Sequence, residues 1–160
     1  MRRFVKVTAI GVAALFVVIQ LVPYGRSHSN PPATQAAKWP PGPGEQLAVQ
    51  SCYDCHSNQT KWRWYTNIAP FSWLIQHDVE DGRSALNFSE WDKDQPDLGE
   101  VSEQISSGEM PPTQYTLIHP SASLSSTEKT QLVEALTRLY AEDPPPGGGD
   151  PPCLAGLLFC

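Results

Sequence analysis

Two cysteines and a histidine stand close together in the order Cys52-Tyr53-Asp54-Cys55-His56. This order fits the pattern C-x-x-C-H, which is typical of covalent haem c attachment. Two thiols three positions apart can each add to one of the two vinyl groups on adjacent edges of a porphyrin. The next residue then brings its imidazole beneath the iron. The sequence therefore predicts one haem c, bound covalently by Cys52 and Cys55, with His56 as the proximal iron ligand.

Two cysteines at this spacing can also form a zinc site, a redox-active pair or a disulfide. A structural zinc site needs a second ligand pair at short spacing, and the next cysteines, Cys153 and Cys160, are far away. A thioredoxin-like redox pair needs a βαβ setting, which the sequence does not offer. A plain disulfide between the two cysteines stays open for an exported protein. If His56 binds iron, its other ring nitrogen should donate to a backbone carbonyl, which we expect in residues 67–70.

Met110 is the candidate for the sixth iron ligand. It is the only methionine besides the initiator, and it lies in the stretch Gly108-Glu109-Met110-Pro111-Pro112. Glycine and proline place it on a stiff loop, whereas a methionine that only fills a core usually lies on a helix face. We therefore predict Met110 as the distal ligand, which would raise the reduction potential relative to two imidazoles. His77 and His119 are the alternatives.

The periodicity of apolar residues predicts an all-α domain over residues 44–142. A first helix should begin near Gly44 and run into the C-x-x-C-H motif. A second should cover residues 71–80, with Gly82 as its C-cap. A third should cover residues 97–107, and Gly108 should end it. The last should begin at Ser125, which forms a capping box with Glu128.

Long connections separate these helices, and a compact fold with such loops needs something else at its centre. A haem would fill that centre, so we expect a cytochrome c-like domain wrapped around one haem. Seven aromatic residues fall between Trp62 and Trp91, and some of them should line the haem edge. An indole N–H, Arg63 or Arg83 could bind a haem propionate.

The two ends of the chain differ from the domain. Residues 1–24 combine Arg2, Arg3 and Lys6 with an apolar run, which predicts an uncleaved signal anchor or membrane helix with the rest of the chain outside. Cleavage, which would release a periplasmic protein, stays open. Residues 25–43 are rich in proline and predict an extended linker. Residues 143–160 form a Pro/Gly-rich tail, expected to be disordered, with an apolar end.

Charge excludes one class of function. The chain has 11 basic and 17 acidic residues, a net charge of −6. Three of the basic residues lie in residues 1–24, so the rest of the chain carries a net charge of −9. A nucleic-acid-binding protein needs a basic face, so we expect no nucleic acid as a partner. An acidic surface can instead steer a basic protein partner.

Several stretches carry a family resemblance: CYDCHSN, WRWYTNIAPFSWLIQHDVEDGR, LNFSEW, GEMPP and HPSASLSSTEK. With these residues the chain, from Pro23 to Ala141, resembles the bacterial haem-binding-domain family of small c-type cytochromes. The resemblance implies one c-type haem, a membrane anchor and a role in or near electron transfer. Arg63 stands where the family often has proline, and the tail from Pro144 onward has no counterpart.

Three functions are compatible with these observations. The first is a single-electron carrier, not an enzyme, that is anchored in the bacterial inner membrane and exchanges electrons with periplasmic or membrane redox proteins. The second is a peroxidase or a gas or redox sensor, with a labile Met110 and with His77 or Arg83 as distal groups. The third is a haem subunit of a larger membrane redox complex, which the apolar tail would help to join.

Overall fold

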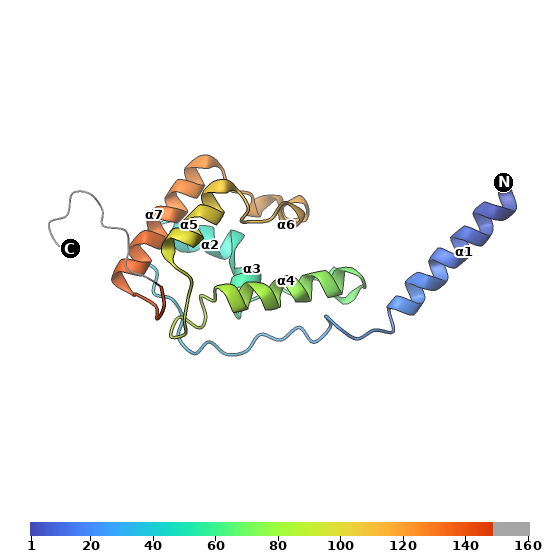
Figure 1. The fold of residues 1–160 in the computed structure, drawn as a ribbon, viewed down its shortest axis with the longest axis horizontal. Helices are drawn as coiled ribbons and strands as arrows, with labels where there is room; N and C mark the ends of the chain where they lie inside the picture. The colour runs from blue at the N-terminus through green and yellow to red at the C-terminus, as the bar shows by residue number, and fades with distance from the viewer. Residues whose placement is uncertain (149–160) are drawn as a thin grey trace.

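The structure is a computed structural model that describes residues 1–148, and these residues form helices and connecting loops (Figure 1). Within them there are seven α-helices, two short 3-10 helices and no strand, which confirms the predicted all-α class. In chain order the elements are α1 (Arg2–Ile19), α2 (Gly44–Ser51), α3 (Tyr53–His56), η1 (Trp64–Asn67), α4 (Phe71–Ala85), α5 (Leu98–Ser107), α6 (Thr113–Ile118), η2 (Pro120–Ala122) and α7 (Ser126–Glu142).

Helices α5 and α7 begin and end as their sequence signals predict. Ser125 and Glu128 form the expected capping box, each satisfying a backbone N–H of the other. Gly108 ends α5 in the left-handed conformation, with a φ of 87°, which glycine adopts without steric cost. These ends fix where the loop that carries Met110 begins.

Helix α4 is longer than the sequence suggests, and its glycine has another role. Residues 71–80 were expected to be helical with Gly82 as the C-cap, but the helix continues to Ala85. At Gly82, helix α4 lies against the C-x-x-C-H segment. A Cβ there would stand 2.6 Å from the backbone oxygen of Cys55 and 2.9 Å from its Cβ. Gly82 therefore serves the close approach of two segments, and the prediction of a helix end at this residue was wrong.

The core is built where α7 packs against α2 and α5. Trp91 and Tyr140 are fully buried and meet edge to face, with ring centroids 5.3 Å apart. Both satisfy their polar atoms, since Trp91 Nε1 donates to the Asp143 carbonyl at 2.6 Å and Tyr140 donates to the Pro96 carbonyl at 3.0 Å. The buried cluster comprises Leu47, Ala48, Tyr53, Leu86, Phe88, Trp91, Leu98, Ile105, Leu132, Leu136, Leu139 and Tyr140.

Helix α1 projects from the domain, and none of its residues is buried (Figure 1). Within residues 1–148, no helix combines the length and the apolar character needed to cross a membrane. The 18 residues of α1 rise about 27 Å at 1.5 Å each, and they include Arg2, Arg3 and Lys6. The helix predicted at residues 1–24 is present, but its assignment as a membrane-spanning segment is not supported.

The proline-rich segment 25–43, predicted to be an extended linker, lies along the domain. Ala37 N donates to the Phe88 carbonyl at 2.9 Å, and Trp91 N donates to the Gln35 carbonyl at 2.8 Å. The indole of Trp39 donates to the Tyr53 hydroxyl at 2.8 Å. This segment is therefore part of the packed domain rather than a free spacer.

The first residues of the Pro/Gly-rich tail are also ordered against the domain. Gln95 N donates to the Pro146 carbonyl at 2.9 Å, so disorder does not begin directly after α7 as expected. Cys153, Cys160 and the rest of residues 149–160 lie outside the described residues.

Candidate haem site

A cavity of about 720 Å³ opens between α3, α4, α5, α7 and the loop that precedes α6. Cys52, Cys55, His56 and Met110 all line it, although Met110 is far from the other three in sequence. Apolar side chains form much of the remaining wall, namely Leu86, Phe88, Val101, Ile105, Leu124, Leu132 and Leu136. The fold thus brings the predicted attachment site and the predicted distal ligand to one apolar cavity.

His56 is held by the end of α4. Its Nδ1 lies 3.1 Å from the Leu86 carbonyl, and the backbone N–H of Phe88 donates to the His56 carbonyl at 2.9 Å. Burial lowers the pKa of His56, which favours the neutral imidazole that binds a metal. The prediction that a carbonyl in residues 67–70 accepts the hydrogen bond from His56 was wrong. The carbonyl of Leu86 takes this role, because α4 runs five residues beyond its predicted end.

Cys52 and Cys55 are free thiols in the structure. Burial raises the pKa of each to about 12, so both are protonated at neutral pH. A redox-active dithiol has the opposite property, a thiol pKa below the ordinary value. Within residues 1–148, no three His, Cys, Asp or Glu side chains gather as a metal site.

The two alternative histidines do not line the cavity formed by residues 1–148. His77 is exposed on α4, with its Nε2 3.3 Å from the Asp81 carboxylate. His119 follows α6, where its Nε2 lies 2.6 Å from the Tyr65 hydroxyl and its Nδ1 3.0 Å from the Tyr115 carbonyl. Of the residues considered for iron, His56 and Met110 are therefore brought together and His77 and His119 are not.

Arg63 and Arg83, which were considered for a propionate, do not line the cavity formed by residues 1–148, and one of the seven aromatic residues does. Arg83 donates to the Ser57 and Ser29 carbonyls and to Asn30 and Thr60 side chains, at 2.8–3.0 Å. It thus holds the loop after C-x-x-C-H against the segment before α2. Of the seven aromatic residues in the Trp62–Trp91 region, Phe88 lines the cavity.

The residues present fit a haem. The cavity has the size of ordinary cofactor sites, its wall is largely apolar, and it presents two thiols and an imidazole in the attachment order. Four carboxylate residues also line it, Asp54, Asp78, Asp81 and Glu100, and no lysine or arginine within residues 1–148 does so. Around a bound haem, a negative surrounding of this kind would stabilise the more positively charged ferric state.

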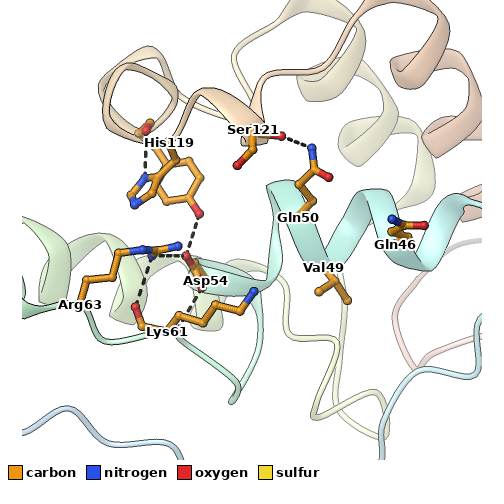
Figure 2. Close-up of a pocket in the computed structure, with 9 residues that line it drawn as sticks. Gln46, Val49, Gln50, Asp54, Lys61, Arg63, His119 and Ser121 are labelled. Atoms are coloured by element: carbon orange, nitrogen blue, oxygen red, sulfur yellow. Dashed lines mark hydrogen bonds and ion pairs between the residues drawn. The ribbon is translucent and has the colours of Figure 1, made fainter.

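Asp54, inside the C-x-x-C-H motif, connects the haem cavity to a second, smaller pocket of about 260 Å³ (Figure 2). Its Oδ2 accepts hydrogen bonds from Arg63 at 2.7 Å and from the Tyr115 hydroxyl at 2.8 Å, and its Oδ1 accepts from Lys61 N at 3.1 Å. Tyr115 belongs to α6, which follows the Met110 loop. This network therefore ties the segment that follows Met110 to the segment that contains His56, and the sequence carried no signal for it.

The charge on Asp54 should contribute to stability in a pH-dependent way. Burial disfavours its charged form, but the hydrogen bonds from Arg63, Tyr115 and Lys61 N outweigh burial, and the pKa of Asp54 lies below its ordinary value. Asp54→Asn should lower the free energy of unfolding at pH 7 by about 1.5–3 kcal/mol, the usual range for a hydrogen bond to a charged group. Urea denaturation of the wild type and the variant measures this loss.

The sign of the pH effect follows from linkage. Because the folded-state pKa is depressed, the stabilisation is complete above the unfolded-state pKa of about 3.9 and is lost as the pH falls through the folded-state value. The gap between wild type and Asp54→Asn should therefore shrink below pH 4. The Tyr115→Phe variant keeps the Asp54 carboxylate. The difference in the free energy of unfolding between this variant and Asp54→Asn should therefore still depend on pH. A gap that stays constant from pH 7 to pH 3 would contradict this role of Asp54.

An all-α domain that gathers a C-x-x-C-H motif and a methionine at one apolar cavity has the features of a haem-binding protein. The chain belongs to the haem-binding domain family, whose match covers residues 14–138. It is also similar to a protein of Escherichia coli strain K12, the cytochrome c peroxidase Ccp, at 24% identity over 89% of this chain. The chain spans only 34% of the length of that relative. No solved structure matches the chain.

Proposed function

We propose that the protein is a c-type cytochrome with one covalent haem, which transfers single electrons. The observation that carries the proposal is the meeting of Cys52, Cys55, His56 and Met110 at the wall of one cavity. The two cysteines would hold the porphyrin, and His56 and Met110 would bind the iron. The bound haem supplies one-electron redox chemistry. The chain's own residues orient His56, exclude water with an apolar wall and keep the distal loop in place.

The location we propose is the periplasmic face of a bacterial inner membrane. Support comes from α1, whose large apolar side chains are exposed along its length, because apolar surface of this extent is unfavourable in water. Basic residues precede the apolar part, which favours a cytoplasmic position for the start of the chain. Redox proteins of the membrane or the periplasm are the partners that this location implies.

Met110→Ala tests the distal ligand and with it the assignment as a carrier. The variant should lose the far-red absorption band of thioether-bound ferric haem and should bind carbon monoxide rapidly when reduced. Its reduction potential should fall by on the order of 100 mV, since axial ligands set haem potentials over a range of about 0.8 V. Absorption spectra and redox titration of the purified haem protein give both readings.

Two matched variants serve as controls for Met110→Ala. His77→Ala and His119→Ala remove the rival ligands, and both should leave the band and the potential of the wild type in place. A spectrum unchanged by Met110→Ala but altered by either histidine variant would refute the assignment of Met110.

A peroxidase is the second candidate, favoured by the similarity to the E. coli cytochrome c peroxidase. It would need an iron with an open or easily opened sixth position and a group that moves protons at the distal side. His77 and Arg83, the groups considered for that role, lie away from the cavity. Rapid peroxide consumption by the reduced wild-type protein would favour this function over electron transfer.

A further inference from the structure

Five large apolar side chains outside α1 are exposed on neighbouring elements of the domain. They expose between 48% and 76% of their surface and are Trp64 in η1, Phe71 and Leu74 at the start of α4, and Leu117 and Ile118 at the end of α6. After residue 24, the described chain has only Val49 and Met110 as further exposed large apolar residues. We name these five residues the apolar face.

Contacts in the structure hold the elements of the apolar face together. Tyr65 of η1 bonds to His119, directly after α6, at 2.6 Å. Helix α4 packs against η1. The five exposed side chains therefore come from three adjoining segments, of which η1 and α4 follow each other in the chain and α6 is far from both in sequence.

Helix α1 leaves the domain on the same side (Figure 1). Gln20, directly after α1, donates to the Ala69 carbonyl at 2.9 Å and accepts from Ala69 N at 3.0 Å. The Tyr24 hydroxyl donates to the Glu80 carboxylate of α4 at 2.8 Å. The base of the apolar helix is thus attached to the loop between η1 and α4, next to the apolar face.

The charge of these segments also differs from that of the rest of the domain. No acidic residue lies between Asp54 and Asp78 or between Glu109 and Glu128, the two stretches that contain the apolar face. Lys61 and Arg63 fall within the first stretch. Arg63 is paired with Asp54, and the acidic residues of α4 follow further along the helix, from Asp78 onward. Exposed aromatic and aliphatic residues in stretches without acids suit the interface of a phospholipid bilayer, where indole rings are favoured.

We propose that the apolar face lies against a phospholipid surface, so that the domain is oriented on the membrane by its own side chains as well as held there by α1. This inference rests on the membrane location under the proposed function. It assigns α4, η1 and α6 to the membrane side and leaves α5 and α7 on the side away from the lipid (Figure 1).

Photolabelling of the full-length haem protein in phosphatidylcholine vesicles tests the inference. The vesicles contain a photoactivatable phosphatidylcholine, and labelled peptides are mapped by mass spectrometry. We expect label in residues 62–75 and 113–118 in addition to α1, and none in α5 and α7. Label confined to α1 would overturn the inference while leaving the membrane location intact. Label absent from α1 as well would overturn the location and the inference together, with the haem spectrum as the check on a folded protein.

A pair of variants measures the contribution of the apolar face. The double variant Leu117→Ser, Ile118→Ser should reduce the vesicle-to-water partition of the full chain by about tenfold, because a partly buried leucine-sized side chain contributes on that scale. Val49→Ser removes an exposed aliphatic side chain from α2, which is not part of the apolar face, and should leave the partition unchanged. Equal partition of the two variants would refute the inference, provided that both keep the wild-type haem spectrum.

Discussion

Replacing both Cys52 and Cys55 by serine should remove all haem from the denatured protein. We expect the wild type to keep its colour and a mass of polypeptide plus one haem after unfolding, because thioether bonds survive denaturation. The double variant should have the mass of the polypeptide alone. It should also unfold at a lower temperature, because the folded state loses the haem that would fill its apolar cavity. Mass spectrometry and thermal unfolding give the two readings.

The single variants are the matched controls for this result. Cys52→Ser and Cys55→Ser each leave one thioether bond, so both should still carry covalent haem after unfolding. A wild-type protein with the mass of the polypeptide alone would contradict covalent attachment. Haem binding without a covalent bond would then be the remaining interpretation of the cavity.

Gly82→Ala should separate the C-x-x-C-H segment from α4. The new methyl group would meet the Cys55 backbone oxygen at 2.6 Å, a distance at which one of the two segments has to move. Overpacking of this kind costs about 1–3 kcal/mol, more than the gain of up to about 1 kcal/mol from replacing glycine in a helix. We expect a lower Tm and incomplete haem loading, since the His56–Leu86 hydrogen bond depends on the same packing.

Gly99→Ala serves as a control, because its expected effect on stability is opposite to that of Gly82→Ala. Gly99 lies in α5, and apart from its chain neighbours and the backbone of its own helix no atom stands within 4 Å of a Cβ added there. Alanine should therefore stabilise the protein by about 0.4–1 kcal/mol through the unfolded state. If Gly82→Ala and Gly99→Ala were both more stable than the wild type by a similar amount, the close contact between Gly82 and Cys55 would not restrict the position of the C-x-x-C-H segment.

The sequence was sufficient for features that local chemistry decides. The capping box at Ser125, the left-handed Gly108 and the apolar stripe of α7 act within a few residues, and the structure confirms the helices they predict. The order C-x-x-C-H is also local, because neighbouring residues would perform the whole of the proposed attachment. The structure adds that Met110, from a distant loop, lines the same cavity.

What the sequence could not supply depends on contacts between distant segments. Gly82 looks like a helix stop by itself, but the helix continues to Ala85, and the presence of Cys55 beside it explains why this position needs a glycine. Because the helix ends later than predicted, the carbonyl that orients His56 is that of Leu86 and not one in residues 67–70. Arg83 looked free to bind a propionate, but its donors are used by Ser29, Ser57 and two side chains of nearby loops.

The docked course of residues 25–43 has a consequence for encounters with other proteins. Hydrogen bonds from Ala37 to Phe88 and from Trp91 to Gln35 leave this connection without slack. A cofactor on a loose tether can sweep a volume around its attachment point and raise its local concentration at several targets. Here the hydrogen bonds hold the connection against the domain. With the membrane location and the electron transfer that we propose, productive collisions would be restricted to donors and acceptors whose own redox centres reach the height at which this connection holds the cavity.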